Sequence, residues 1–206
     1  MRMYAACLAS YNNGDLHGEW FDLEDYSDKD ELLEAIAEKV LRTSPYPNVT
    51  VECPECDGPV ASTPGCDAGD WQCPCCDGSG RVPSAEEWAA HDWDGEGLSG
   101  FGEYPDLDEV LTHVRMVSEH GDAWVAYVDH VGAHHATEED FSDSFAGAYD
   151  SPEDWAEEFL TDTGALGSIP ESLRYYFNFE SYARDARIGG YMAFVEHGGK
   201  TYVFHS

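Results

Sequence analysis

Residues 106–131 read DLDEVLTHVRMVSEHGDAWVAYVDHV, a stretch whose apolar residues recur at helical spacing. A helix over 106–120 would carry five aliphatic residues on one face, namely Leu107, Val110, Leu111, Val114 and Val117. Gly121 can end this helix because glycine adopts a left-handed cap conformation without strain. A second helix over 123–131 would turn Trp124, Tyr127, Val128 and Val131 inward. The pattern therefore predicts two consecutive helices that pack through these residues.

The surroundings of this helical pair are unusually acidic. Residues 86–162 contain 22 Asp and Glu residues and one base, Arg115, so one positive against 22 negative charges gives −21. Such a composition is typical of disordered chains, which lack the apolar surface for a core. Aromatic residues supply that surface here, namely Trp88, Trp93, Phe101, Tyr104, Trp124, Tyr127, Phe141, Phe145, Tyr149, Trp155 and Phe159. The stretch is therefore predicted to fold with its carboxylates outward.

The whole chain shares this imbalance of charge. Its 206 residues contain 42 Asp and Glu against 10 Lys and Arg, a formal net charge of −32. Self-repulsion of this size opposes folding, so the charge is expected to serve a basic partner, such as a DNA-binding groove, a cationic protein or metal ions. Direct binding to nucleic acid or to an anionic membrane is disfavoured, because the phosphates would be repelled. Adaptation to high salt is the alternative explanation of the charge.

The N-terminal region mixes strand and helix signals. The apolar run over 3–9 predicts a buried strand, the Asn- and Gly-rich run over 11–15 a turn, and 17–23 the returning strand. Ser27 is expected to cap a helix that runs to about Arg42, with Asp30 as the capping-box acid. The opening unit is therefore expected to be α+β.

Further helices and a terminal hairpin are predicted after residue 83. Helix starts are indicated by Ser84-x-x-Glu87, Thr137-x-x-Asp140, Ser151-Pro152 and Ile169-Pro170. Another helix is expected over 179–187. Strand-like runs over 191–195 and 201–204 flank the His197-Gly198-Gly199 turn, as in a β-hairpin.

Together these patterns predict an α+β fold in an elongated, multi-domain chain. Small antiparallel sheets are expected at both ends, with a helical acidic middle and a small zinc-ribbon-like insertion. The expected divisions are an N-terminal α+β domain (1–48), the insertion (49–83), the acidic middle domain (84–147) and a C-terminal α/β domain with the terminal hairpin (148–206).

The insertion contains the strongest local motif. Cys53-Pro-Glu-Cys56 and Cys73-Pro-Cys-Cys76 are two C-x-x-C pairs separated by 16 residues, a spacing found in zinc sites. Four thiolates complete a tetrahedral shell, so Cys53, Cys56, Cys73 and Cys76 are predicted to hold one structural zinc per chain. Gly58, Gly78 and Gly80 would leave backbone amides free to approach the sulfurs. The run from Cys73 to Gly80 resembles the zinc-binding repeats of DnaJ-type chaperones.

Other readings of the reactive side chains stay open at this point. Cys66 and Cys75 are spare cysteines that can substitute as ligands, and a redox dithiol is the rival to zinc, whereas Cys7 lies in an apolar strand and is expected in the core. A metal site at His130, His134 and His135 beside Glu138 and Glu139 is weighed against a polar loop, which we favour. No H-E-x-x-H, G-x-S-x-G or phosphate-loop motif occurs, so the chain is not expected to be an enzyme.

Several blocks in the chain resemble the ArdA antirestriction family. They are Tyr4, LASYNNG over 8–14 and GEW over 18–20, EWAAHDWDG over 87–95, YDSPED over 149–154, TGAL over 163–166 and IPESLRYYFNFESYARD over 169–185. The resemblance covers about 1–47 and 84–206. The cysteine region at about 49–82 departs from the family pattern as an insertion.

The resemblance implies an inhibitor that acts without catalysis. Family members are homodimers that mimic bent B-form DNA, occupy the DNA-binding groove of type I restriction-modification enzymes, and are carried by mobile genetic elements. A dimer of this chain would carry twice 32, or 64, net negative charges. At one charge per about 1.7 Å, this corresponds to about 110 Å of duplex.

A spaced carboxylate array is the site expected for such mimicry. Its members are Glu103, Asp106, Asp108, Glu109, Glu119, Asp122, Asp129, Glu138, Glu139 and Asp143. Taken singly, each of them also fits an ordinary solvated face. The resemblance places the dimer interface in the C-terminal part, where Tyr149, Trp155 and Phe159 are expected in the core or in the contact.

The alternative function is a zinc-stapled acidic adaptor that binds another basic DNA-binding protein or a chaperone client. A cytoplasmic location is expected in either case. Residues 1–10 lack the features of a signal peptide, and no window approaches 18 uncharged apolar residues. The clustered cysteines fit a reducing compartment.

Overall fold

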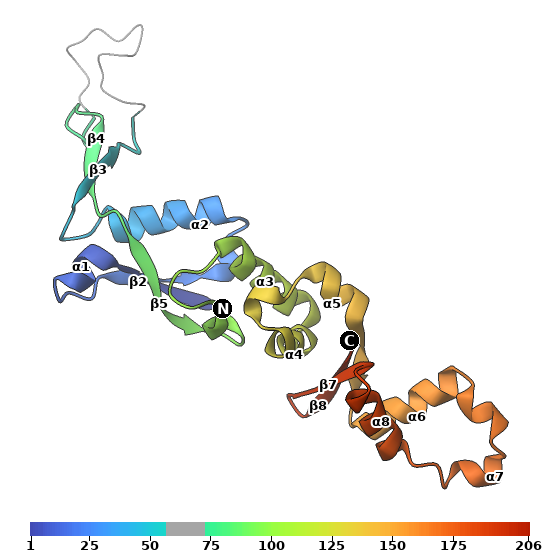
Figure 1. The fold of residues 1–206 in the computed structure, drawn as a ribbon. Helices are drawn as coiled ribbons and strands as arrows, with labels where there is room; N and C mark the ends of the chain where they lie inside the picture. The colour runs from blue at the N-terminus through green and yellow to red at the C-terminus, as the bar shows by residue number, and fades with distance from the viewer. Residues whose placement is uncertain (57–72) are drawn as a thin grey trace, which may run out of the picture. The chain divides into compact units, whose positions relative to one another are not determined.

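The computed structural model describes residues 1–56 and 73–206 and divides into two compact units, Met1–Leu111 and Thr112–Ser206 (Figure 1). Each unit combines helices with small antiparallel sheets, and sheets lie near both ends of the chain. The predicted α+β class is therefore confirmed, whereas the four-part division remains a prediction. Gly58 and Cys66 lie outside the described residues.

The sheet of the first unit has the order β2-β1-β5 and is antiparallel throughout. β1 (Arg2–Cys7) is its central strand, followed by the short helix α1 (Leu8–Asn12) and by β2 (Gly18–Asp22). Gly18 pairs with Ala6, and a Cβ at this position would lie 2.5 Å from the Ala5 carbonyl oxygen, so the tight strand pairing requires glycine.

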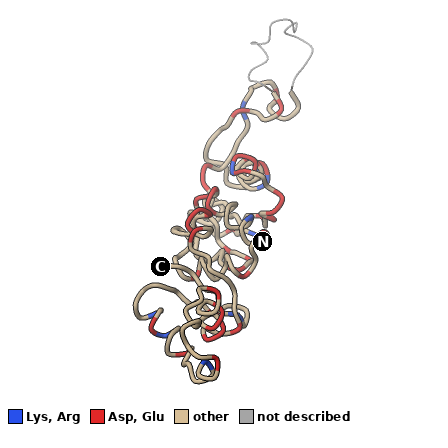
Figure 2. Tube along the Cα trace, turned by 90° about the vertical axis from the view of Figure 1, so that its right-hand side faces the viewer, with Lys and Arg blue, Asp and Glu red and all other residues tan. Residues whose placement is uncertain are grey.

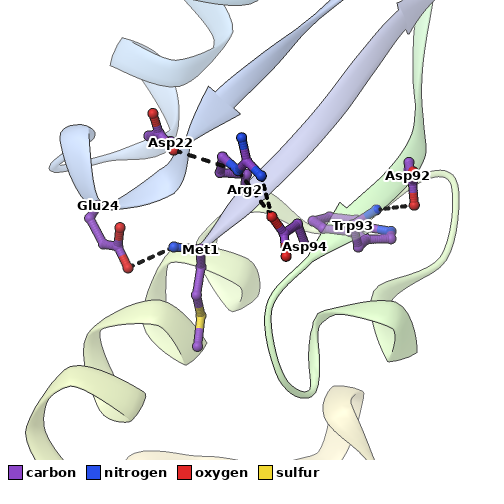
Figure 3. Close-up of polar contacts among 7 residues, drawn as sticks. All are labelled: Met1, Arg2, Asp22, Glu24, Asp92, Trp93 and Asp94. Carbon is purple, nitrogen blue, oxygen red and sulfur yellow. Dashed lines mark hydrogen bonds and ion pairs between the residues drawn. The ribbon is translucent and has the colours of Figure 1, made fainter.

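One end of this sheet is held by charges (Figure 3). The N-terminal ammonium lies 2.7 Å from the Glu24 carboxylate, in the 3-10 turn η1 (Leu23–Asp25). Arg2 pairs with Asp94 on β5 and lies 4.0 Å from Asp22 on β2. The hydrogen bond from Arg2 and its charge lower the pKa of Asp94. Arg2 therefore links both neighbours of the central strand.

The prediction of a helix after Ser84 is wrong. Residues 88–94 form β5 (Trp88–Asp94), which pairs with β1. Ala89 and Ala90 are buried in this sheet, whereas Ser84 ends β4 (Arg81–Ser84) and donates its hydroxyl to the Ala85 carbonyl. The capping-box letters were present, but an open edge of β1 more than 80 residues away in sequence determined the structure.

The first long helix forms as expected but begins one residue later than expected. α2 (Lys29–Ile36) continues as the π-helical turn η2 (Ala37–Leu41). Asp28, not Ser27, is its N-cap and accepts a 2.9 Å hydrogen bond from Glu31 N–H. Its buried stripe consists of Leu32, Ile36 and Val40. β3 (Val49–Glu52) then pairs with β4 as a separate two-stranded sheet.

The helices predicted between residues 106 and 144 are confirmed. After the 3-10 turn η4 (Leu98–Phe101) come α3 (Leu107–His120), α4 (Asp122–Val131), the turn η5 (Ala133–His135) and α5 (Glu138–Ser144). Gly121, with φ +55°, separates the first two helices, and Thr137 caps α5 through Asp140 N–H. Trp124, Tyr127 and Val128 are buried and Val131 is half-buried.

The C-terminal sheet has the order β6-β8-β7. It consists of β6 (Phe145–Tyr149), which the sequence analysis missed, and of the predicted hairpin β7 (Met192–His197) and β8 (Lys200–His205). In the chain, β6 and β7 are separated by α6 (Pro152–Asp162), capped by Ser151, η6 (Ala165–Ser168), α7 (Glu171–Arg174) and α8 (Phe179–Ile188). The helix predicted to start at Ile169-Pro170 is thus only the single turn α7.

Helices cover both faces of this sheet. Tyr202 and Phe204 of β8 belong to a core cluster with Trp124, Tyr127 and Phe141 from α4 and α5. Val203, between them, belongs to a second cluster with residues of α6 and α8. This alternation follows from the two-residue period of a strand. The acidic helices therefore stand on a packed aromatic core.

Candidate functional site

The ten carboxylates of the predicted array are all exposed. Glu103, Asp106 and the first-turn acids Asp108 and Glu109 lie before or at the start of α3, and Glu119 lies in its last turn. Asp122 and Asp129 belong to α4, and Glu138, Glu139 and Asp143 to α5. Figure 2 shows carboxylate positions in every described part of the trace, with few Lys and Arg between them.

Half of the array also has a local structural role. Asp108, Glu109, Asp122, Glu138 and Glu139 lie in first turns of helices. Negative charge is favourable there because it faces the positive end of the helix dipole. Glu119, Asp129 and Asp143 lie outside the first turns, so the helix dipole does not explain their presence.

Basic side chains lie beside four members of the array. Arg115 on α3 lies 3.5 Å from Glu119 and 2.7 Å from Glu138, and so links α3 to α5. The hydrogen bond from Arg115, followed by its charge, lowers the pKa of Glu138. Lys29 pairs with Asp108, and the His197 ring lies 3.7 Å from Asp129. The pairs of Arg115 and Lys29 are exposed and contribute little to stability individually.

The histidines expected in a polar loop do not gather as metal ligands. Within residues 1–56 and 73–206, His130, His134 and His135 take part in no group of three metal-binding side chains. The ring of His130 stacks on Phe204 with centroids 6.4 Å apart. We therefore retain the polar-loop reading.

The four predicted cysteines do converge. Cys53, Cys56, Cys73 and Cys76 place their sulfur atoms within 4.8 Å of one another, at the end of the β3–β4 hairpin. The Sγ–Sγ separations are 3.8 Å for Cys53–Cys73 and 3.5 Å for Cys56–Cys76. Cys56 is half-buried and the other three are buried. One turn of each C-x-x-C motif thus supplies two thiols to one cluster.

This geometry fits a tetrahedral metal with four sulfur ligands. Zinc–sulfur bonds of about 2.3 Å place the sulfurs at tetrahedron corners about 3.8 Å apart. Gly80 N–H donates to Cys76 Sγ at 3.3 Å, as expected for an amide that supports a ligand thiolate. Although burial opposes it, this bond and those from the neighbouring thiols lower the pKa of Cys76 to about 7. Thiolate is the form that binds metal.

The remaining described cysteines lie outside the cluster. Cys75 is exposed, and its hydrogen bond with Cys53 raises the pKa of Cys75 to about 11, which keeps it a thiol. Cys7 is fully buried in β1 and donates to Ser44 Oγ at 3.3 Å.

The three residues expected in the core or in a dimer contact lie at the second C-terminal core cluster. Trp155 is 2% exposed, and Phe159 stacks on it with centroids 5.2 Å apart. Tyr149 is half-buried and donates to Glu158 Oε1 at 3.4 Å. A core role is therefore clear for Trp155, while a contact through Tyr149 and Phe159 remains a prediction.

Sequence reasoning missed a more exposed apolar group nearby. Its members are Leu173, Tyr175, Tyr176, Ile188 and Tyr191, which are 54 to 90% exposed. They fall in residues 163–191, where three acids and three bases cancel. This neutral segment in a chain of charge −32 was the available sequence signal.

Comparison with protein families gives one match of nearly full length. The family model described as "Antirestriction protein (ArdA)" matches residues 3–201. Comparison with curated proteins gives no match. Among the described residues, no helix is long and apolar enough to cross a membrane.

Proposed function

The chain belongs to the ArdA family of antirestriction proteins, and we propose that it inhibits type I restriction-modification enzymes by occupying their DNA-binding groove as a mimic of B-DNA. The proposal is carried by one observation: all ten array carboxylates are exposed, and the six that belong to the second unit lie on helices that pack on one aromatic core. Carboxylates held on packed helices resemble the fixed phosphates of a duplex. It also explains a net charge that otherwise only opposes folding.

Mimicry of this kind requires no catalytic residue. The carboxylates replace DNA phosphates against the basic groove, so binding should weaken steeply as salt rises. We place the encounter in the cytoplasm, where incoming DNA meets the host enzyme and thiols stay reduced.

The test compares two variants that lose equal charge. The first, Glu119→Gln with Asp129→Asn and Asp143→Asn, removes array acids outside the first turns. The control, Asp15→Asn with Glu19→Gln and Glu38→Gln, removes three exposed acids of the first unit. Inhibition of DNA cleavage and of methylation is measured over a salt series.

We expect the first variant to lose affinity and to reduce the log–log salt slope by up to about three, since each phosphate-like contact contributes about 0.9. The control should stay close to wild type. Equal losses in both variants would show that net charge, and not the array, determines binding. Strong binding to unrelated basic proteins, without inhibition of the enzyme, would favour an acidic adaptor instead.

We further propose a homodimer formed through residues 163–191. Two copies of a chain with charge −32 repel each other over most of their surface, but this segment is neutral. Its Tyr175 and Tyr176 side chains are 90% and 77% exposed. Exposed aromatic groups of this size are typical of interfaces.

Sedimentation of Tyr175→Ser with Tyr176→Ser tests this surface. The variant should be monomeric at concentrations where wild type is dimeric. Tyr104→Ser is the control, because Tyr104 is 72% exposed but lies outside the segment. A dimer that survives the double substitution would exclude this interface.

For the cysteine cluster we propose one structural zinc per chain. Cys53, Cys56, Cys73 and Cys76 would hold it, leaving no open position for substrate or water. The metal would fix the two C-x-x-C turns at the end of the hairpin relative to each other. The few apolar residues of the hairpin do not explain how these turns are held together.

A further inference from the structure

A cleft of about 660 Å³ lies between the α2–η2 helix and the β3–β4 hairpin. Its helical wall is formed by Glu34, Ala37, Leu41 and Arg42. Its other wall is formed by residues 49–54 of β3 and the following turn, and by 84–86 at the base of the hairpin. Its volume falls in the range of ligand and peptide sites.

The lining shows that the open edge of β3 faces this cleft. A strand that presents a face contributes alternate residues, because successive side chains point to opposite sides. Here all six consecutive residues 49–54 line the cleft. Of β4, only its last residue contributes. Within the described residues, the sheet contains only these two strands, so β3 pairs with β4 alone.

The hairpin register leaves backbone groups of β3 aimed at the cleft. Cys53 N–H donates to the Gly80 carbonyl at 3.0 Å, so in an antiparallel ladder Val51 with Val82 forms the next hydrogen-bonded pair. Thr50 stands opposite Pro83, which has no N–H to donate. The N–H groups of Thr50 and Glu52 therefore point away from β4, toward the open edge.

The two edges of the hairpin differ in their ability to donate main-chain hydrogen bonds. Pro83 blunts the outer edge of β4, as prolines do on edge strands that must not pair. Thr50, directly opposite, leaves the edge of β3 able to donate. Arg81 donates to the Thr50 carbonyl, which occupies part of that acceptor and leaves the Thr50 N–H able to donate.

The charges around the cleft select a basic occupant. The lining contains three carboxylates, Glu34, Glu52 and Glu86, against one cation, Arg42, which pairs with Glu34. Leu41, Val49 and Val51 add apolar residues to the same lining. From Val49 to Pro54 an extended strand covers about 17 Å, room for a segment of about five residues.

We propose that β3 is a docking edge on which an extended, Lys- or Arg-bearing segment of the target enzyme adds as a third strand in this cleft. This inference rests on the proposed function, since it names a second contact with the same enzyme. Main-chain hydrogen bonds from Thr50 and Glu52 would supply affinity, and the carboxylates would select basic side chains.

The test uses Thr50→Pro with Thr50→Val as its matched control. Both substitutions remove the threonine hydroxyl, which accepts from Arg81 Nε at 3.2 Å, but only proline removes the N–H at the edge. Pro83 shows that the hairpin accommodates proline in this register. We expect Thr50→Pro to bind a purified type I restriction-modification enzyme about tenfold more weakly, the effect of about 1.4 kcal/mol of lost hydrogen bonding. Thr50→Val should bind within about twofold of wild type.

Equal binding by the two variants would overturn the docking edge while leaving the DNA-mimic function intact. Failure of wild type to bind would overturn both. Hydrogen exchange of the wild-type peptide over residues 49–54 keeps the test independent of variant folding. Its amides should gain protection only with enzyme present. Protection that rises with protein concentration in the absence of enzyme would assign the cleft to a second copy, against the proposal.

Discussion

Removal of the proposed zinc should unfold the hairpin and leave the second unit folded. The apolar core of the hairpin, apart from its cysteines, consists of Val82 and the half-buried Val51. Their burial contributes at most about 3–6 kcal/mol. Ordering the twenty described residues of 49–56 and 73–84 costs about 20 kcal/mol, at about 1 kcal/mol each. The deficit of about 14–17 kcal/mol is close to the roughly 10–16 kcal/mol that structural zinc supplies in small zinc-finger peptides.

The assay combines metal analysis with hydrogen exchange on two substitutions. Cys73→Ser removes a fully buried member of the cluster, whereas Cys75→Ser changes an exposed cysteine outside it. Wild type and Cys75→Ser should contain about one zinc per chain. Cys73→Ser should lose the metal, and its amides over 49–52 and 81–84 should exchange freely. Protection that is unchanged in metal-free Cys73→Ser would refute the reasoning, because the hairpin would then fold without a metal.

Three further predictions concern the charge and the core. Trp124→Phe should destabilise the second unit by about 1–3 kcal/mol in urea unfolding, because the buried indole N–H donates to His113 Nδ1 at 3.1 Å and its loss leaves that nitrogen without this donor. Arg115→Gln should lower the thermal midpoint near neutral pH. This difference should shrink as the pH falls from 4.5, the ordinary glutamate pKa, through the lowered pKa of Glu138. A carboxyl group whose pKa is lowered by folding stabilises the fold while it is ionised, and this contribution is lost on protonation. A gap that widens on acidification would contradict this sign. The wild-type midpoint should rise between about 0.01 and 1 M NaCl, where the Debye length falls from about 30 to 3 Å, because self-repulsion is screened. A midpoint independent of salt would show that the net charge does not strain the fold.

Features with purely local causes were predictable from the sequence. Thr137 and Ser151 cap α5 and α6 because each side chain accepts from an N–H three residues ahead. The apolar spacing of α3 and α4 and the C-x-x-C pairs are local in the same sense. Each of these patterns depends only on residues close together in sequence, and each structure was found where it was expected.

Features that depend on a distant partner were not predictable. β5 forms because β1 offers an edge, and Arg2 reaches Asp94 across 92 positions. β6 is only five residues long and pairs with β8 near the chain terminus. The cleft beside β3 requires the helix, the hairpin register and Pro83 together. No window of sequence contains all three, so the site became visible only in the fold.

The acidic array and the hairpin should be separable in function. Array acids such as Asp129 and Asp143 belong to the second unit, whose core clusters contain no residue of the hairpin. The open edge of β3, in contrast, exists only while the hairpin is folded. Metal-free Cys73→Ser should therefore keep the array and lose the docking edge, so its affinity for the enzyme should fall by about the tenfold expected for Thr50→Pro. The two substitutions combined should be no weaker than Cys73→Ser alone, because both remove the same contact. If Cys73→Ser abolishes inhibition while α4 keeps its exchange protection, the hairpin belongs to the principal contact with the enzyme and the array does not suffice.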